Sequence, residues 1–190
     1  MPLSYYPSLT RQDLIYQLKN YSTRYSEEAA FVDQFNTLLD HPDAYERHHL
    51  PGHITGSAWI VDPKNQSVLL VHHAKLNKWL QPGGHSDGDE NTIAVALKEA
   101  REETGIMNFE LPSYSIFDID IHPIPSRMDI PEHLHYDIRF IFYASVNDRI
   151  IVSEESHDVK WIAFKDIQTY TNNTSIIRML EKVEVRNYEL

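Results

Sequence analysis

An α/β or α+β sandwich, in which helices cover a mixed sheet, is the fold that this sequence predicts. Apolar residues recur at helical spacing before residue 41, over residues 91–104 and again near the C-terminus. Between these stretches, short segments alternate or run apolar in the manner of strands. Elements that each have one apolar face bury those faces against one another, and the result is a layered domain.

The first 40 residues predict two helices. Thr10 is placed to cap the segment RQDLIYQLKNY, whose apolar surface is expected from Leu14, Tyr16, Leu18 and Tyr21. Ser26 opens a second helix, and His41-Pro42 ends it. The segment 41–53 contains two prolines and predicts a connector. We expect residues 1–50 to form an N-terminal helical extension, serving as a lid, a dimerisation element or plain core packing, and residues 51–190 to form the main domain.

Strands are expected from residue 53 onward. The segments ITGSAWIVD and SVLLVHHA flank a turn signal at residues 63–66, and this predicts a hairpin. Three further segments have strand character: FELPSYSIFDIDIHPI, HYDIRFIFYASV and VKWIAF. The last segment, TNNTSIIRMLEKVEV, predicts a terminal helix capped by Asn172, Asn173 or Thr174.

Composition excludes several classes of protein. The formal charge is −11, from 28 acidic residues against 17 Lys and Arg, and such a surface repels duplex nucleic acid. A small phosphorylated substrate stays compatible with that charge if a cation lies between carboxylates and phosphate. The absence of cysteine excludes disulfides, thiolate zinc sites and a cysteine nucleophile. No run reaches membrane-spanning length, and the start MPLSYYPSLTRQ lacks a signal pattern, so we expect no membrane partner and a cytoplasmic location.

The stretch 91–104 predicts a helix with an acidic edge. Helical geometry puts four apolar residues on one stripe, namely Ile93, Ala96, Leu97 and Ala100. Glu99 and Glu103 then lie one turn apart beside the stripe, with Glu102 next to them. Asp89 could cap the start, and Gly105 is placed to end the helix in a left-handed conformation. Crowded carboxylates repel one another, and Mg²⁺ or Mn²⁺ relieves that repulsion, although a solvated acidic face is the plain alternative.

The segment from Gly84 to Ile106 resembles the Nudix box, G-x5-E-x7-R-E-U-x-E-E-x-G-U, where U is a bulky apolar residue. Glu90 follows Gly84 at the expected spacing, and the run Lys98 to Ile106 completes the motif over 23 positions. Two positions differ from the family pattern: Lys98 stands in place of Arg, and Ala100 is small. The wider resemblance covers roughly residues 53–165, with WLQPGG before the box and HDVKWI after it.

The resemblance implies an α/β/α sandwich around a mixed sheet and a hydrolase in which water attacks phosphorus in a nucleoside diphosphate linked to another moiety. Glu99 and Glu103 would bind the catalytic Mg²⁺ or Mn²⁺, with Glu102 and the Gly83 carbonyl as further ligands. Glu90 would orient the box, and Lys98 would position the helix glutamates by ion pairing, without the forked pairing of Arg. Homodimers are frequent in the family, so a homodimer is a further expectation.

Which group takes the proton of the attacking water is open. Glu99 could act as the base instead of as a ligand. Alternative bases or ligands are found in an acidic loop before the strand of Trp161, namely Glu154, Glu155 and Asp158.

Candidate substrate-binding residues lie outside the helix. Trp79, Gln81 and His85 bracket the Gly-Gly turn and could face phosphates. Alternating polar residues occupy two further strands: Asp118, Asp120 and His122 on one, and His133, His135, Asp137 and Arg139 on the other. If these strands pair, Arg139 could bind phosphate, and His122, His133 and His135 could bind a second metal ion or a base. A solvated sheet face is the alternative.

Three functions can be compared on this scaffold: a diphosphate hydrolase, a non-catalytic nucleotide-metabolite sensor and a prenyl diphosphate isomerase. The complete set of glutamates disfavours a sensor. The isomerases generally rely on a cysteine, which this chain lacks. The hydrolase is therefore the function that the sequence predicts, with its substrate unspecified.

Overall fold

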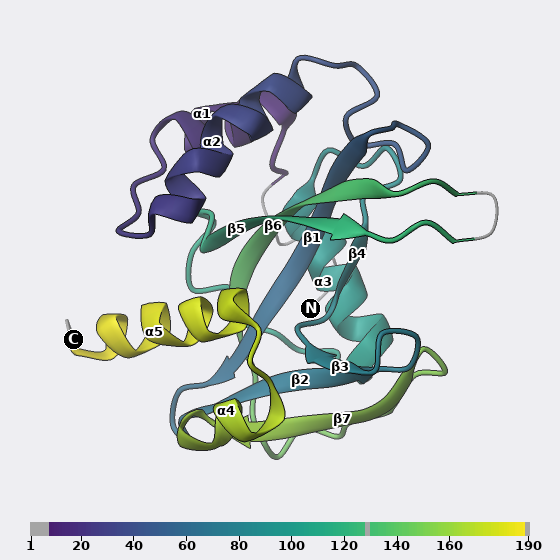
Figure 1. Cartoon of the computed structure of the whole chain (residues 1–190). Helices are drawn as coiled ribbons and strands as arrows, with labels where there is room; N and C mark the ends of the chain where they lie inside the picture. Colours follow the sequence, from purple (N-terminus) through teal and green to yellow (C-terminus); the bar gives the residue numbers. More distant parts are fainter. Residues whose placement is uncertain (1–7, 128–129, 189–190) are drawn as a thin grey trace. The chain divides into compact units, whose positions relative to one another are not determined.

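The computed structural model describes residues 8–127 and 130–188, with side chains up to residue 184 (Figure 1). Residues 1–7 lie outside the described residues. They belong to the N-terminal segment in which we found no signal pattern. Thirteen elements are assigned: α1 (Arg11–Lys19), α2 (Ser26–Leu39), β1 (Gly52–Asp62), β2 (Ser67–His73), β3 (Lys78–Leu80), β4 (Gly83–His85), α3 (Thr92–Thr104), β5 (Asp118–Ile124), β6 (His133–Tyr143), β7 (Ser156–Ala163), η2 (Phe164–Asp166), α4 (Ile167–Tyr170) and α5 (Thr174–Tyr188).

The chain divides into two compact units. Unit 1 consists of Met1–Ser57, Gly83–Lys98 and Ser113–Phe140, and unit 2 consists of Ala58–Pro82, Glu99–Pro112 and Ile141–Leu190. Three elements, β1, β6 and α3, begin in unit 1 and end in unit 2. The units do not follow the boundary at residue 50 that the sequence favoured, and that domain division stays a prediction.

The strands pair in the order β3-β2-β1-β6-β5, with β4 also pairing with β1 and β7 with β2. The hairpin of β1 and β2 is antiparallel, as predicted, and so are the pairs β1–β4, β2–β3, β2–β7 and β5–β6. Strands β1 and β6 run parallel, because Leu134 N–H donates to the Pro51 carbonyl near their starts and Ala144 N–H donates to the Val61 carbonyl near their ends. The mixed sheet with flanking helices confirms the predicted fold class.

In unit 1, α1 and α2 pack side by side (Figure 1). Thr10 caps α1 in a capping box with Asp13, and Leu14 and Leu18 are buried, as predicted. The buried Glu28 carboxylate of α2 accepts hydrogen bonds from the Tyr21 hydroxyl, at 2.6 Å, and from the Ile119 N–H of β5, at 3.3 Å. The N-terminal helices are therefore built into the core of their unit.

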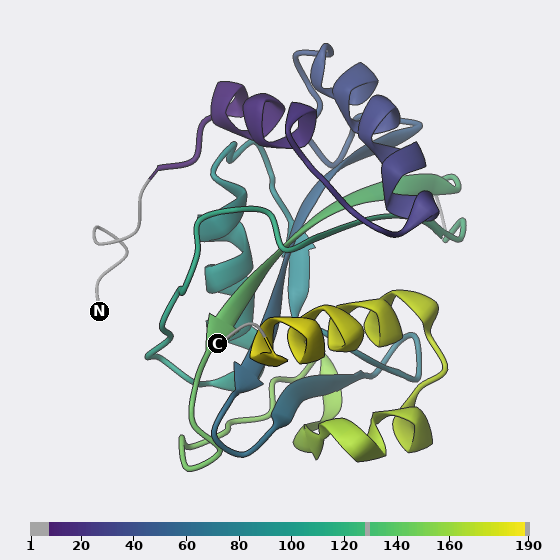
Figure 2. The same cartoon turned by 90° about the vertical axis from the view of Figure 1, so that its left-hand side faces the viewer.

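In unit 2, the hydrophobic centre forms around β2. Its first strand residues are buried and pair with the end of β1 on one side and with β7 on the other. Helix α4 follows directly after η2 at the end of β7 (Figure 2). Helix α5 buries an apolar stripe consisting of Ile176, Met179, Leu180 and Val183. Its start is held by Asn173, whose side-chain oxygen accepts from Ser175 N–H, and this confirms one of the three predicted caps.

Three local predictions were wrong. Tyr16 is 70% exposed, so only one face of α1 is apolar. Of the predicted strand over FELPSYSIFDIDIHPI, only Asp118–Ile124 is a strand, because the segment before it contains Pro112 and forms turns with an isolated bridge from Glu110 to Tyr143. The Asp89 carboxylate accepts from Asn91 N–H, whereas the Asn91 side chain accepts from Ala94 N–H and caps α3.

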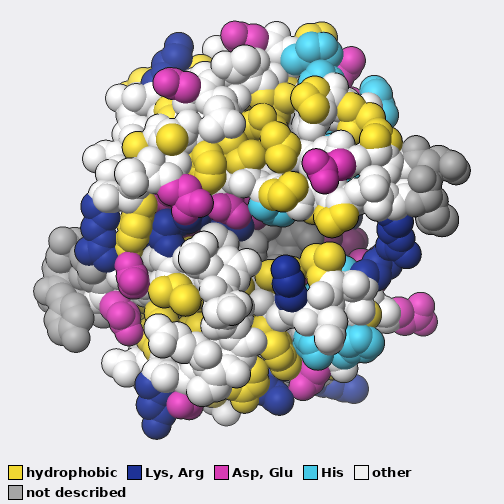
Figure 3. Space-filling view, in the orientation of Figure 1, with side chains coloured by type: hydrophobic (Ala, Val, Ile, Leu, Met, Phe, Trp, Pro, Cys, Tyr) yellow, Lys and Arg dark blue, Asp and Glu magenta, His cyan; other side chains and the backbone are white. Residues whose placement is uncertain are grey.

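On the face shown in Figure 3, acidic and basic side chains are interspersed with hydrophobic ones. The excess of acidic residues is thus spread over the visible surface instead of gathered in one block. Across the part of the chain that the structure describes, no helix has the length and apolarity needed to cross a membrane.

Candidate functional site

Helix α3 carries the acidic edge that the sequence predicted. Its apolar stripe is fully buried, and it consists of Ile93, Ala96, Leu97 and Ala100. Glu99 and Glu103 are half-buried beside the stripe, whereas Glu102 and Lys98 are exposed. Gly105 ends the helix with a φ of 72°, and its N–H donates to the Arg101 carbonyl. Two partly desolvated carboxylates one turn apart provide hard oxygen donors of the kind that Mg²⁺ and Mn²⁺ bind.

The first half of α3 packs closely on β1 in unit 1. A Cβ atom at Gly56 of β1 would lie 2.8 Å from the Thr92 carbonyl oxygen and 3.1 Å from Val95. Only glycine allows such an approach of helix and strand backbones. This contact fixes the start of the helix against the sheet.

The loop before α3 is held by unit 1 residues. Gly83 of β4 pairs with Ser57 of β1, and a Cβ at Gly83 would overlap the Ser57 hydroxyl. The Glu90 carboxylate accepts a hydrogen bond from the Arg11 side chain at 2.8 Å. Arg11 also donates to the carbonyls of His41 and Pro42. The side chain that we expected to orient the box is thus tied to the first turn of α1.

A buried charge network occupies one face of β5 and β6. The two strands pair with Asp118 opposite Arg139, Asp120 opposite Asp137 and His122 opposite His135, so the polar residues converge as predicted. The Arg139 guanidinium donates to Asp137 at 2.7 Å, to Asp120 at 2.9 Å and to Asp118 at 3.0 Å. Asp137 also accepts from the hydroxyls of Thr55 and Ser57, and the whole network is buried instead of solvated.

This network changes the role expected for Arg139. Desolvation would lower its pKa, but the three neighbouring aspartates raise it above the ordinary value, so the side chain stays charged. Each of its three guanidinium nitrogens already contacts a carboxylate, and the side chain is 2% exposed. A phosphate would have to displace these aspartates, so the phosphate-binding role predicted for Arg139 is replaced by a structural one.

Imidazoles gather at the end of the same polar face in unit 1. The ring centroid of His53 lies 5.2 Å from that of His85, 5.1 Å from that of His133 and 5.1 Å from that of His135. Burial lowers the pKa of His53 to about 4 and that of His135 to about 2, and it also lowers the pKa of His85. These three rings are therefore neutral near pH 7.

In unit 2, an aromatic group precedes the Gly-Gly turn. Trp79 stacks on His72 with ring centroids 4.9 Å apart and an interplanar angle of 12°. The Tyr170 ring centroid, with the ring plane at 90° to that of Trp79, and the Lys160 ammonium group each lie 5.5 Å from the Trp79 centroid. Trp79 is half-buried in this group, and it therefore contributes to local packing.

A model of the NUDIX domain matches residues 52–183. The chain belongs to the Nudix family. Because the match covers most of the chain, the resemblance that the box first indicated is confirmed. The Nudix hydrolases are enzymes that act on pyrophosphate bonds, and this chain is an enzyme of that kind.

Two curated relatives illustrate the breadth of the family. The chain is 27% identical over 99 residues to mouse bis(5'-nucleosyl)-tetraphosphatase (asymmetrical), a match covering 52% of this chain and 65% of that enzyme. It is 25% identical over 132 residues to a probable DHNTP pyrophosphohydrolase of Lactococcus lactis, covering 68% of this chain and 77% of that protein.

Solved Nudix structures share the fold at low identity. A C. elegans Ap4A hydrolase in a binary complex gives a TM-score of 0.52 at 16% identity, covering 72% of this chain and 98% of that one. The E. coli dihydroneopterin triphosphate pyrophosphohydrolase gives a TM-score of 0.54 at 15% identity, covering 68% and 92% respectively. These likenesses concern the fold alone.

The Nudix site residues predicted from the sequence are distributed over both units. Unit 2 contains Gln81, Glu99, Glu102 and Glu103, and unit 1 contains Gly83, His85, Glu90, Lys98, His133, His135 and Arg139. Glu154 and Glu155 are exposed in the loop before β7 of unit 2, whereas Asp158, which we predicted in that loop, lies on β7, 3.3 Å from the Lys160 ammonium group. The assignment of ligands and base among these groups stays a prediction.

Two residues next to the Nudix segments were not singled out by the sequence reasoning. His53 shares a strand face with Thr55 and Ser57, and the alternation HITGS would have shown this once the strand was extended to Gly52. Arg11 contacts Glu90 across 79 residues of sequence, and no local pattern signals such a partner.

Proposed function

We propose that this Nudix enzyme hydrolyses a phosphoanhydride bond in a nucleoside diphosphate linked to another moiety, with Glu99 and Glu103 holding Mg²⁺ or Mn²⁺. The observation that carries the proposal is the pair of half-buried carboxylates one turn apart on α3. Glu102 is placed on the same helix as a further ligand, and the Gly83 carbonyl is the backbone ligand that we expect from the Nudix box.

The electrostatics of α3 favour a bound cation. Like charges at this spacing repel by a few tenths of a kcal/mol on an open helix, and partial burial increases the repulsion. The donor set consists of carboxylates, which fits a hard divalent ion better than a soft one. When bound, such an ion would neutralise charge on the diphosphate and lower the pKa of a coordinated water.

The chain's own residues would position the reactants and move one proton. The oxygen of water forms a bond to one phosphorus atom, the bridging P–O bond breaks, and the released phosphate group takes the bridging oxygen. A carboxylate accepts the proton of the attacking water, and Glu99 would serve as this base only in place of binding the ion. Lys98 would hold the neighbouring carboxylates in place, and Arg11 would hold Glu90.

Substrate contacts are proposed for residues flanking the box. Gln81 and His85 border the Gly-Gly turn, and His133 and His135 extend the polar face that begins at β4. The names of the two curated relatives indicate a bis(5'-nucleosyl) tetraphosphate and DHNTP as substrates of those proteins. These names support a phosphoanhydride chain as the recognised feature, and we propose that class for this chain.

The experiment is a hydrolysis screen with one decisive variant. Wild type is assayed with Mg²⁺ or Mn²⁺ on a bis(5'-nucleosyl) tetraphosphate, DHNTP and nucleoside diphosphate derivatives, and release of phosphate-containing products is followed by chromatography. Glu103→Gln keeps the size of the side chain but removes its charge, and we expect at least about a 100-fold loss of kcat/KM. Glu184→Gln, at an exposed position on α5, is the matched control and should retain activity.

Two outcomes would contradict the proposal. Full activity of a folded Glu103→Gln protein would exclude the α3 edge as the ion site. Tight binding of nucleotide by wild type without any product release would favour the sensor that the sequence left as an alternative.

We further propose that the enzyme acts in the cytoplasm, on small substrates and not on duplex nucleic acid, and that it forms a homodimer. The charge of −11 and the absence of cysteine support the first two proposals. Sedimentation measurements and a duplex-binding assay at low salt would test the last two.

A further inference from the structure

Three histidines from three strands of unit 1 present their nitrogens to one point. His53 lies on β1, His85 on β4 and His135 on β6. One ring nitrogen from each lies within 4.8 Å of the other two, and the His85 and His135 ring centroids are 4.9 Å apart. Strands β1, β4 and β6 run beside one another in both views of the chain (Figures 1 and 2), so the sheet itself holds the three side chains together.

The hydrogen bonding of His53 leaves one of its ring nitrogens with a free lone pair. Its Nδ1 lies 3.3 Å from the His49 carbonyl oxygen, which can only accept, so Nδ1 carries the proton and donates. In a neutral ring the other nitrogen, Nε2, then has a free lone pair. His53 is 1% exposed, and its Nε2 has no hydrogen-bond partner among the described residues. A buried acceptor without a partner requires an explanation, and a bound ion is one.

His135 presents the same situation from the neighbouring strand. Its Nε2 is also buried and lacks a hydrogen-bond partner in the part of the chain that the structure describes. The ring of His122 packs against His135 with centroids 5.5 Å apart, and His122 Nδ1 lies 3.3 Å from the Asp120 carboxylate. Asp120 in turn accepts from Arg139. Histidine ligands are commonly surrounded by polar groups of this type, which fix their orientation.

We propose that His53, His85 and His135 bind one divalent transition-metal ion of the Zn²⁺, Co²⁺ or Ni²⁺ type. Three imidazoles are a donor set suited to these ions, whereas the carboxylates of α3 suit Mg²⁺ or Mn²⁺. Ion–nitrogen bonds of about 2.0–2.1 Å in a tetrahedral site put the nitrogens about 3.3 Å apart. Small side-chain rotations therefore complete the site, and the fourth position is left to water or to a substrate oxygen.

This site shares His85 and His135 with the proposed substrate contacts, but it shares no ligand with the proposed Mg²⁺ or Mn²⁺ site on α3. None of its three ligands is on α3, and the Nudix glutamates do not enter its donor set. Loss of one site should therefore leave ion binding at the other intact, and this separation can be measured.

The test is a Co²⁺ titration of chelator-treated full-length protein. Visible absorption distinguishes tetrahedral Co²⁺ with nitrogen ligands, which absorbs strongly, from six-coordinate Co²⁺ on carboxylates, which absorbs weakly. We expect one equivalent of strongly absorbing Co²⁺, displaced by Zn²⁺, and a rise in Tm when Zn²⁺ is added. His85→Gln and His135→Gln should each weaken this binding at least about 100-fold.

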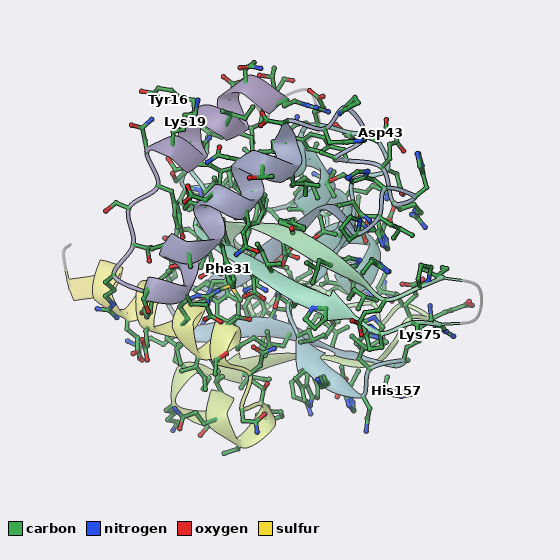
Figure 4. All side chains as sticks on the ribbon, turned by 45° about the horizontal axis from the view of Figure 1, so that its top comes forward. Tyr16, Lys19, Phe31, Asp43, Lys75 and His157 are labelled. Atoms are coloured by element: carbon green, nitrogen blue, oxygen red, sulfur yellow. The ribbon has the colours of Figure 1, made fainter. Side chains whose placement is uncertain are left out.

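Two further variants test whether the Co²⁺ spectrum comes from the proposed histidine site. His157→Gln removes an exposed imidazole on β7 of unit 2, labelled in Figure 4, and it should leave the Co²⁺ spectrum unchanged. Glu103→Gln should also retain the spectrum even if it abolishes hydrolysis with Mg²⁺. His85 and His135 are both half-buried, and circular dichroism checks that each variant folds. The proposal is wrong if wild type gives no strong band, if folded His85→Gln keeps it, or if Glu103→Gln removes it.

Discussion

The two halves of strand β1 have opposite side-chain chemistry. In unit 1, His53, Thr55 and Ser57 bring polar atoms into a buried region, and both hydroxyls donate to Asp137. In unit 2, the four residues from Ala58 to Val61 are apolar and fully buried, and Ile60 pairs with Leu69 of β2. One continuous strand thus passes from a polar interior to a hydrophobic one.

The difference between the two halves of β1 distinguishes residues that stabilise the fold from residues that position the candidate site. Burial of apolar area stabilises a protein in rough proportion to that area, so the second half of β1 is explained by folding alone. Burying a charge is unfavourable unless partners compensate it, and replacing a buried ion pair by well-packed apolar residues often does not reduce stability. The polar half is therefore better explained by positioning of His53 and Gly83 than by stability.

The largest effect on stability is expected from removing the cation at the centre of the buried charge network beside the polar half of β1. Arg139→Met keeps most of the side-chain volume but leaves Asp118, Asp120 and Asp137 without their cation. We expect the free energy of unfolding to fall by about 3–5 kcal/mol at pH 7, measured by urea denaturation.

Arg139→Lys provides the control. It keeps the charge but offers one nitrogen where the guanidinium offers three, so its loss of stability should be smaller. An equal loss for the two variants would contradict this account, since it would indicate lost packing instead of uncompensated charge.

An intermediate effect is expected in the apolar half. Leu69→Ala in β2 deletes a fully buried side chain between β1 and β7, and we expect a loss of about 3 kcal/mol from lost burial and the cavity left behind. Here the loss should be the same at pH 7 and pH 4, because no titratable group changes its environment. A marked pH dependence would show that the two halves are not as distinct as their side chains indicate.

The elements of the apolar half could be predicted because their signals are local. The alternation and turn chemistry of residues 53–73 predicted the hairpin, and the stripe from Ile93 to Ala100 predicted α3 with its acidic edge. The strand expected over residues 109–117 failed because apolar content there serves loop packing, with Phe109 and Phe117 buried outside any strand.

The polar half could be predicted only in part. The alternation of Asp118, Asp120 and His122 against His135, Asp137 and Arg139 indicated that these side chains converge, and the pairing of β5 with β6 confirms it. The sequence alone could not show that the face is buried, because a solvated face has the same pattern. The contacts of Arg11 with Glu90 and of His53 with His135 depend on tertiary packing between distant segments.

The smallest effect on stability is expected at the turn after β1, where the Asp62 carboxylate accepts several hydrogen bonds. Asp62 accepts hydrogen bonds from Lys64 N–H, Asn65 N–H, the Asn65 amide and Val146 N–H. Burial alone would raise the pKa of Asp62, but these hydrogen bonds lower it below the usual value of 3.8. Its contribution to stability is thus present above that value and is lost as the pH falls through the folded-state pKa.

Asp62→Asn should therefore lower the free energy of unfolding by about 1–2 kcal/mol at pH 7, and the difference should shrink as the pH falls below 3.8, measured by urea denaturation over a series of pH values. Asp148→Asn is the control, since that half-buried carboxylate accepts a hydrogen bond from the Ser145 N–H, and this variant should cost less. Equal losses for the two variants would mean that the number of hydrogen bonds does not determine the effect. In that case the apolar pairing of β1 with β2, and not Asp62, would fix the turn.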